Sequence, residues 1–246
     1  MKTALITGST SGIGQQIGLD LLDKNYFVYF NGHTQESTKE LEKEIEYRDI
    51  NTDYLPTFNI ICQDLSTIDL NIQLANWFIK NGVFLDIIVL NLGITDRTPF
   101  GKIEPEAWNR VFETNLSGGF FLLQALRNRI RPNGRIIFIS SILSKIPHGT
   151  SISYAVSKAA INAIIPYLAK EFKDRKITVN AICPGFIEGT NWHINKSKKQ
   201  IKKIEQKILL KRFGTRKEIS NLVLEIINNS YINGTVIDIT GGYNIK

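Results

Sequence analysis

The chain has 246 residues, a formal net charge of +7, 43% hydrophobic residues and 22% charged residues. This composition is typical of a soluble globular protein, and the length suits one well-buried α/β domain spanning residues 1–246. Two cysteines are too few for a disulfide framework, which excludes a disulfide-stapled fold. The lysine excess is spread along the chain and peaks at residues 196–207, so it predicts a solvated helix face and no nucleic-acid site.

The sequence also gives no sign of a membrane or metal protein. Its longest apolar runs have the length of strands, and the N-terminal stretch runs into glycines without a signal-peptide pattern. We therefore expect a cytoplasmic protein with no membrane segment. The histidines, His33, His148 and His193, lack metal-ligand spacing, so we expect no metal site.

Short apolar runs rich in Val, Ile and Phe alternate with amphipathic stretches along the chain. This alternation predicts an α/β fold with a single Rossmann-type, doubly wound parallel sheet and helices on both faces. Helices should fill the gaps between strands, the two longest at about 104–130 and 152–173, with a kink or a local irregularity at Pro166. Residues at about 186–212 predict an inserted helical lid. The expected strands lie at about 3–7, 26–31, 54–60, 85–90, 135–140, 177–182 and 234–239.

A glycine-rich turn joins the first strand to the first helix. Gly8, Gly12 and Gly14 follow the spacing G-x-x-x-G-x-G in GSTSGIG. Glycines let the backbone turn tightly and approach a pyrophosphate, while the N-terminus of the next helix presents free N–H groups to it. A simple glycine turn is the alternative, but the strand-turn-helix context favours nucleotide binding.

The end of the second strand bears on the choice of nucleotide. An acidic residue there would bind the ribose hydroxyls of NAD, but Asn31, Gly32 and His33 occupy the place. A 2′-phosphate is compatible with these residues, with His33 or Ser11 as its contact. We expect NADP as the cofactor and keep NAD as the alternative, because no arginine is present either. Asp64, after the third strand, either meets the adenine edge or caps the following helix.

Tyr154 and Lys158 lie four residues apart in the second long helix and so share one face. A neighbouring ammonium favours phenolate and lowers a pKa that is ordinarily about 10. Tyr154 then becomes a proton donor or acceptor near neutral pH. Alone, such a pair also occurs by chance on solvated helices.

Together these motifs resemble the classical short-chain dehydrogenase/reductase family over essentially the whole chain. The family's glycine motif matches Thr7 to Gly14, and its Tyr-x-x-x-Lys motif matches Tyr154 and Lys158. Its catalytic Ser matches Ser141, and its helical Asn matches Asn115 in WNRVFETN. Further matches are Pro184 and Gly185 after the sixth strand, and Gly241 and Gly242 near the C-terminus.

The resemblance implies an NAD(P)-dependent oxidoreductase that transfers a hydride between NADP(H) and a carbonyl or alcohol. It implies that Tyr154 protonates the forming alkoxide, Ser141 orients the carbonyl oxygen, and Lys158 lowers the pKa of Tyr154 while holding the nicotinamide ribose. Asn115 would fix a water linked to Lys158. The cofactor-binding residues that it implies are Gly8, Ser11, Gly12, Ile13, Gly14, Asn31, His33, Asp64, Leu65, Asn91, Gly93, Tyr154, Lys158, Pro184, Gly185, Ile187 and Thr190.

Two departures from the family pattern affect the cofactor site. Leu92 replaces a small residue in the segment after the fourth strand, so we expect an altered local backbone or adenine pocket. After Pro184 and Gly185, the residue expected to be Thr is Gly189, and Thr190 follows one position later.

Within the family the pattern is closest to 3-oxoacyl-acyl carrier protein reductases, through PGFIE and RFGTRKEI. This implies reduction of 3-oxoacyl thioesters in fatty acid biosynthesis. Arg129, Arg131 and Arg175 are expected at the mouth of the site, where they would dock an acidic carrier protein. A sugar or polyol dehydrogenase is the alternative within the family. Two other classes stay open: an α/β hydrolase, since GSTSG nearly matches G-x-S-x-G with Thr10 at its centre, and a non-catalytic nucleotide-binding regulator.

The two long helices carry more apolar surface than one sheet face can cover. Small residues would let a second helix approach closely, and two aromatic residues add bulk. The pattern predicts a homo-oligomer, a tetramer in our reading, and members of the resembled family pair these same helices. The residues concerned are Ala155, Ala159, Ala160, Ala163, Phe120 and Phe121.

Overall fold

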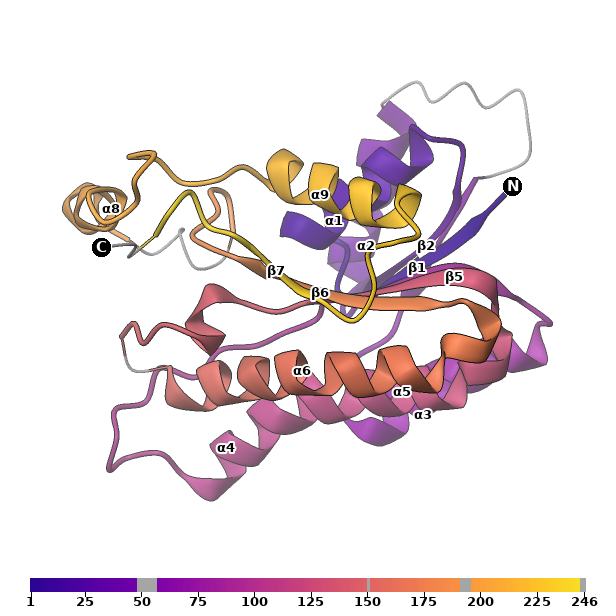
Figure 1. The fold of residues 1–246 in the computed structure, drawn as a ribbon, viewed down its shortest axis with the longest axis horizontal. Coiled ribbons are helices and arrows are strands. Elements are labelled where there is room, and N and C mark those ends of the chain that lie inside the picture. Colours follow the sequence, from indigo (N-terminus) through magenta and orange to yellow (C-terminus); the bar gives the residue numbers. More distant parts are fainter. Residues whose placement is uncertain (48–56, 150, 191–195, 244–246) are drawn as a thin grey trace.

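Seven parallel strands form one sheet through the middle of the molecule (Figure 1). The computed structural model describes residues 1–47, 57–149, 151–190 and 196–243. The strands lie side by side in the order β3-β2-β1-β4-β5-β6-β7. Their bounds are Thr3–Ile6 (β1), Phe27–Gly32 (β2), Phe58–Cys62 (β3), Leu85–Leu90 (β4), Ile130–Ile139 (β5), Thr178–Pro184 (β6) and Val236–Ile239 (β7).

This topology confirms the predicted doubly wound parallel sheet. The strand bounds differ mainly at β5, which begins at Ile130 instead of residue 135. The pairing shifts register there, so that Ile130 faces Leu85 while Arg135 faces Ile87. Between these two pairs β5 contains more residues than β4, and Asn133, with φ of 62°, lies in the resulting bulge. The first residues of the strand predicted at 54–60 lie outside the described residues.

Helices cover both faces of the sheet, as the alternating pattern predicted (Figure 1). One layer contains α1, α2 and α9, and the other contains α3, α4, α5 and α6. The helix α8 lies beyond the carboxyl end of the sheet, at the left of Figure 1. The bounds are Gly12–Leu22 (α1), Gln35–Tyr47 (α2), Ile68–Lys80 (α3), Pro105–Phe112 (α4), Gly118–Ala125 (α5), Ile152–Glu171 (α6), Lys198–Glu205 (α8) and Arg216–Asn228 (α9).

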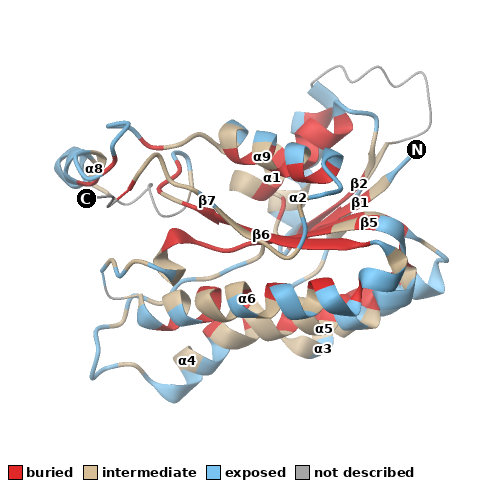
Figure 2. Ribbon diagram, in the orientation of Figure 1, coloured by how far each residue is buried: buried red, intermediate tan, exposed pale blue. Residues whose placement is uncertain are grey.

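Two hydrophobic cores follow from this layering, and both appear as buried inner surfaces in Figure 2. Leu74 and Phe78 of α3 pack with Ile161 of α6 against one sheet face. Ile17 of α1 and Ile226 of α9 pack against the other face. Every residue of β6 is buried. A strand covered on both faces reads as a continuous apolar run, which is why the sequence pattern located the strands.

The long helix predicted at 104–130 is interrupted. After α4, residues Glu113–Ser117 form one π-helical turn, and α5 continues to Ala125 before a 3₁₀ turn at Arg127–Arg129. Such π turns occur mostly at functional sites because they shift side chains relative to the regular helix. This one contains Asn115, whose contacts are described below.

The second long helix, α6, runs without interruption through Pro166, so the residue does not end the helix. Within its 20 residues, an 18-residue window reaches a mean hydropathy of 1.2, which by length and composition alone would suffice to cross a membrane. One side of α6 instead packs on the sheet through Ile161 and Ile165. Its other side exposes Ile152, Val156 and Tyr167.

A third, smaller cluster lies at the carboxyl end of the sheet, within the segment predicted as a lid. Ile204 and Ile208, in and after α8, pack with Phe186, Phe213 and Tyr243. A capping box between Ser197 and Gln200 starts α8. Part of the predicted lid, residues 191–195, lies outside the described residues, as does His193.

Candidate active site

The glycine turn after β1 has the geometry that the sequence predicted. Gly8 and Gly12 have φ of 57° and 64°, a backbone region that side chains disfavour. An added Cβ at Gly14 would lie 2.5 Å from Asn91 Nδ2 and 2.7 Å from Gly8 O, whereas at Gly12 it would meet nothing within 4 Å. Gly14 therefore permits close packing, while Gly12 faces open space. Ser11 precedes α1 without a side-chain capping bond, so the first turn keeps its N–H groups for another acceptor.

Asn31 has a different role from the one expected. Its side chain is buried, with Oδ1 accepting from Gly8 N at 3.1 Å and Nδ2 donating to Gln63 O at 2.9 Å. Through these two bonds the Asn31 amide holds the glycine turn against the end of β3. Asn31 therefore supports the turn, while the neighbouring His33 is exposed.

The residues after β3 also divide into an exposed and a buried member. The carboxylate of the exposed Asp64 accepts hydrogen bonds from Ser66 N at 3.0 Å and from Ser66 Oγ at 2.8 Å. The residue that caps α3 is Thr67, which accepts from Leu70 N, so the helix-capping alternative for Asp64 is wrong. Leu65 is buried in the core.

The segment after β4 is tied to the glycine turn. Asn91 Nδ2 donates to Gly8 O at 2.8 Å, and Asn91 N donates to Thr7 Oγ1 at 3.0 Å. Leu92 packs against Gly8, where its Cδ1 lies 3.1 Å from the position of an added Cβ. At Gly93 an added Cβ would lie 3.1 Å from Lys158 Nζ. The chain thus brings this segment into direct contact with the Lys158 ammonium, and a side chain at residue 93 would press against it.

Ser141, Tyr154 and Lys158 meet at the carboxyl ends of β5 and β6. Ser141 follows β5, its Oγ accepts from Leu143 N at 3.2 Å, and its hydroxyl is hydrogen-bonded to the Tyr154 side chain. Lys158 is buried, lies 5.8 Å from the centroid of the Tyr154 ring, and donates from Nζ to Ile139 O at 2.8 Å. The cluster can therefore orient an oxygen atom and supply a proton to it.

Burial shifts the pKa values of this pair in opposite directions. Desolvation raises the pKa of Tyr154, opposed by its hydrogen bond with Ser141. Desolvation also lowers the pKa of Lys158 to about 8. The net shift is opposite to the lowering expected from Lys158, because loss of water is the largest influence on the phenol and the ammonium is held by the Ile139 carbonyl. Tyr154 is therefore a protonated donor at neutral pH.

Asn115, in the π turn, is buried and joins two parts of the site. Its Oδ1 accepts from Ile94 N at 2.7 Å, and its Nδ2 donates to Ile94 O at 2.9 Å and to Ser157 Oγ at 3.0 Å. The side chain therefore connects the segment after β4 to α6, the helix that carries Tyr154 and Lys158. Both amide protons are donated within the protein, so Nδ2 has none left for a water.

Known proteins with this combination of sequence and fold were found by comparison. A family model described as short chain dehydrogenase matches residues 2–201. The chain belongs to the short-chain dehydrogenase family. The 3-oxoacyl-[acyl-carrier-protein] reductase FabG of Aquifex aeolicus is 34% identical over 246 residues, covering 98% of this chain and 96% of the relative. The FabG of Buchnera aphidicola subsp. Schizaphis graminum is 31% identical over 245 residues, with the same coverage.

A solved structure agrees with this assignment. The Pseudomonas aeruginosa RhlG/NADP active-site complex superposes with a TM-score of 0.89 at 26% identity, covering 99% of this chain and 96% of that one. The chain is therefore an NAD(P)-dependent oxidoreductase of the short-chain dehydrogenase type, as predicted. The hydrolase and non-catalytic alternatives are wrong, and Thr10 belongs to the glycine turn of a dinucleotide site.

The short-chain dehydrogenase site is completed by the segment after β6. Pro184 ends the strand, and an added Cβ at Gly185 would lie 2.9 Å from Thr240 Cα. Ile187 is buried and bridges to Gly214. Thr190 donates from Oγ1 to Ile187 O at 2.9 Å, so this hydroxyl closes a local turn. These residues lie with the glycine turn at the carboxyl ends of the strands, which is where folds of this type bind a dinucleotide.

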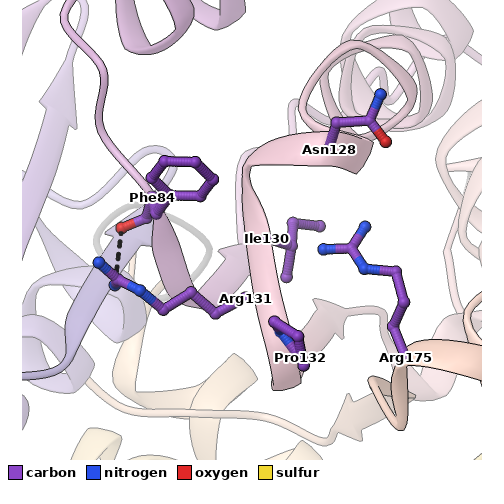
Figure 3. A pocket seen from close by; sticks show the side chains of 6 residues that line it. All are labelled: Phe84, Asn128, Ile130, Arg131, Pro132 and Arg175. Carbon is purple, nitrogen blue, oxygen red and sulfur yellow. Dashed lines mark hydrogen bonds between the residues drawn. The ribbon is translucent and has the colours of Figure 1, made fainter.

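The basic patch expected at the mouth of the site lies elsewhere. Arg131 and Arg175 line a hollow of about 560 Å³ with Phe84 (Figure 3), and Arg129 stacks over the same ring at 5.0 Å. This hollow is at the amino end of β5, roughly 25 Å along the strand from Ser141 at about 3.3 Å per regular step of the ladder. The prediction that these arginines lie beside the active site of their own chain is therefore wrong. Helix ends occur at both edges of a sheet, and the sequence did not distinguish them.

Sequence reasoning missed several residues that build the site. Thr7 Oγ1 accepts from two backbone N–H groups after β4, and Ser157 on α6 accepts from Asn115. The Ile139 carbonyl holds the Lys158 ammonium. A Thr at the end of the first strand and a Ser beside the catalytic Lys were visible in the sequence. Only the fold shows that they are hydrogen-bonded to the site.

Proposed function

We propose that this enzyme reduces the carbonyl group of 3-oxoacyl thioesters with NADPH. The observation that carries the proposal is the cluster of Ser141, Tyr154 and Lys158 beside an open glycine turn, in a chain whose relatives bear the name 3-oxoacyl-[acyl-carrier-protein] reductase. The nicotinamide cofactor supplies a hydride to the carbonyl carbon. The protein must then position the carbonyl and protonate its oxygen.

The residues of the cluster divide these tasks. The Ser141 hydroxyl donates a hydrogen bond that orients the carbonyl oxygen, next to the Tyr154 hydroxyl. Tyr154 gives its proton to this oxygen as negative charge develops there. Lys158, with a pKa of about 8, stabilises the resulting phenolate by its charge and can return a proton towards it. Asn115 and Ser157 keep α6 in place during these steps.

NADP is the cofactor that the end of β2 favours. Residues 31–34 include no carboxylate, so nothing in that segment repels a 2′-phosphate. The polar groups available there include the exposed His33 and the hydroxyls of Thr34 and Ser37. Titration of NADPH and NADH by fluorescence should give tighter binding of NADPH; equal or tighter binding of NADH would contradict this choice.

The surroundings of the site favour an acyl chain over a sugar or polyol. Ile142 follows Ser141 directly, and it packs with Phe186, Phe213 and Tyr243 in the apolar cluster beneath α8. A polyol needs hydrogen-bonding partners for each hydroxyl, whereas apolar walls bind a hydrocarbon chain. Sugar or polyol oxidation remains the second candidate, because dehydrogenases of this family share the same catalytic core.

The proposal also covers the partner protein, the oligomeric state and the cellular location. We propose that the thioester is carried by an acyl carrier protein and that the enzyme works in fatty acid biosynthesis as a cytoplasmic homotetramer. The relatives' name supports the carrier protein and the pathway. The exposed apolar side of α6 supports self-association. The cytoplasmic location rests on the sequence argument alone.

One assay separates the candidate substrates. NADPH oxidation is followed at saturating cofactor with 3-oxoacyl thioesters on acyl carrier protein, the same acyl groups on a small thiol, ketosugars and quinones. We expect the highest kcat/KM with 3-oxoacyl groups. Preferential turnover of a ketosugar would favour the second candidate and refute thioester reduction as the function.

A further inference from the structure

A chain of hydrogen bonds behind Ser141 connects three elements of the site. Cys183 is buried at the end of β6, and Asn162 lies on α6 eight residues after Tyr154. Ser144 closes the 3₁₀ turn Ile142–Ser144 that follows Ser141. None of the roles described above uses Cys183, Asn162 or Ser144.

With the Asn162 amide oriented as in this structure, the donors and acceptors run in one direction along the chain of hydrogen bonds. Ser144 Oγ donates its single proton to Ser141 O at 2.5 Å, so it accepts from Asn162 Nδ2, which lies 2.7 Å away. The same amide turns Oδ1 towards Cys183, whose Sγ–H donates to it at 3.6 Å. Cys183 Sγ also lies 3.8 Å from Ser144 Oγ, which brings the three side chains together as one cluster.

We propose that Ser144, Asn162 and Cys183 are positioning residues whose directed hydrogen bonds hold the Ser141 turn in register with Tyr154 on α6. The proposal rests on the catalytic roles proposed for Ser141 and Tyr154. Catalysis by these two groups requires their hydroxyls to converge on one oxygen atom, and small displacements of such groups reduce rates strongly. Ser141 is on a short turn and Tyr154 is on a helix, so a side-chain link between the two elements fixes their relative position.

The thiol end of the chain adds an electrostatic reason. Cys183 is neutral when it donates its proton to Asn162. A negative charge on this sulfur would raise the pKa of both Tyr154 and Lys158. A phenol with a still higher pKa is a weaker acid and transfers its proton less readily. Loss of the proton that Cys183 donates would therefore make Tyr154 a poorer proton donor.

Kinetics of matched variants test the positioning role. Asn162→Leu preserves the side-chain size and removes both hydrogen bonds, and we expect kcat to fall roughly 10- to 100-fold with an unchanged Kd for NADPH. Cys183→Ala should lower kcat less, and Cys183→Ser, which restores an O–H donor, should recover it. The control is Ser153→Ala, also on α6, which removes a buried hydroxyl with no hydrogen-bond partner among the described residues and should keep the wild-type kcat.

The pH profile separates positioning from simple stabilisation. In Asn162→Leu, both the size of kcat and its dependence on pH should change. If this variant lost only thermal stability and kept the wild-type kcat and pH profile, the positioning role would be refuted.

A spectroscopic measurement tests the hydrogen bonds without turnover. In a Cys62→Ser background, Cys183 supplies the single S–H stretching band in the infrared spectrum. Asn162→Leu should shift this band to higher frequency, because the thiol loses its acceptor, whereas an unshifted band would overturn the proposed chain. A shifted band in an enzyme that reduces no thioester would leave the hydrogen bonds supported and refute the proposed function.

Discussion

At the scale of single residues, the site depends on two ionisable side chains whose burial acts in opposite ways. Desolvation raises the pKa of Tyr154, which keeps the phenol protonated. It lowers the pKa of Lys158 to about 8, so the ammonium loses its proton more readily. A protonated phenol is the form that reduction of a carbonyl requires. A buried ammonium lowers the free energy of unfolding of the chain.

Tyr154→Phe keeps the aromatic ring and removes the transferable proton. We expect turnover to fall by about two to four orders of magnitude, while NADPH still binds, because the ring packing is preserved. Steady-state NADPH oxidation and a fluorescence titration of the cofactor measure the two effects. Wild-type turnover in this variant would refute the role of Tyr154 as proton donor.

Lys158→Met should reveal the buried charge through the pH dependence of stability. The pKa of Lys158 is about 8 in the folded chain, against an ordinary value of 10.5, so between these values the unfolded state binds more protons and wild-type stability rises with pH. The free energy of unfolding of the variant relative to wild type should therefore fall by about 3 kcal/mol between pH 7 and pH 10.5. Urea titrations of both proteins at each pH measure it. A difference independent of pH would show that Lys158 is not destabilised by burial.

At the scale of elements, glycines set how closely the chain segments approach one another. Gly14 lets α1 lie against Asn91 and the carbonyl of Gly8, and Gly93 makes room for the Lys158 ammonium. The π turn places Asn115 where it can join the segment after β4 to α6. The site is therefore assembled from contacts between elements that are far apart in the sequence.

Gly14→Ala and Gly119→Ala form a matched pair that tests this view. The Cβ at residue 14 would collide with Asn91 and Gly8, so we expect NADPH affinity to fall by at least about tenfold. The Cβ at residue 119, in α5, would meet Leu90 at ordinary distances of 3.7 and 3.8 Å. This change should preserve affinity and raise stability by about 0.5–1 kcal/mol. Cofactor titration and thermal unfolding measure both, and normal affinity in Gly14→Ala would contradict the close-packing argument.

At the scale of the whole molecule, the outer side of α6 is the surface on which we expect self-association. Ile152 and Val156 are about two-fifths exposed, and Tyr167 is three-quarters exposed. Ala163 is exposed between them, which would let another helix approach. Since Tyr154 and Lys158 are on the same helix, covering this side would restrain the catalytic pair.

Light scattering should find a homo-oligomer, with a tetramer as our expectation, and Val156→Glu should shift the mass towards that of a 27.9 kDa monomer. A buried carboxylate without a partner is costly in such an interface. Lys80→Glu, on the exposed end of α3, serves as the control that should leave the mass unchanged. A wild-type enzyme that is fully active as a monomer would refute the assembly.

The sequence by itself determined the fold class, the family and the location of the main catalytic motifs. Parallel strands covered on both faces leave apolar runs that can be read without a structure, and Gly8, Gly14, Tyr154 and Lys158 show their spacing within short segments. Only the tertiary structure decided the role of Asn31, the raised pKa of Tyr154 and the distance of the arginines from the site. It also brought Ser144, Asn162 and Cys183 together. Desolvation and side-chain hydrogen bonds depend on which distant segments become neighbours, and that information appears only when the chain is folded.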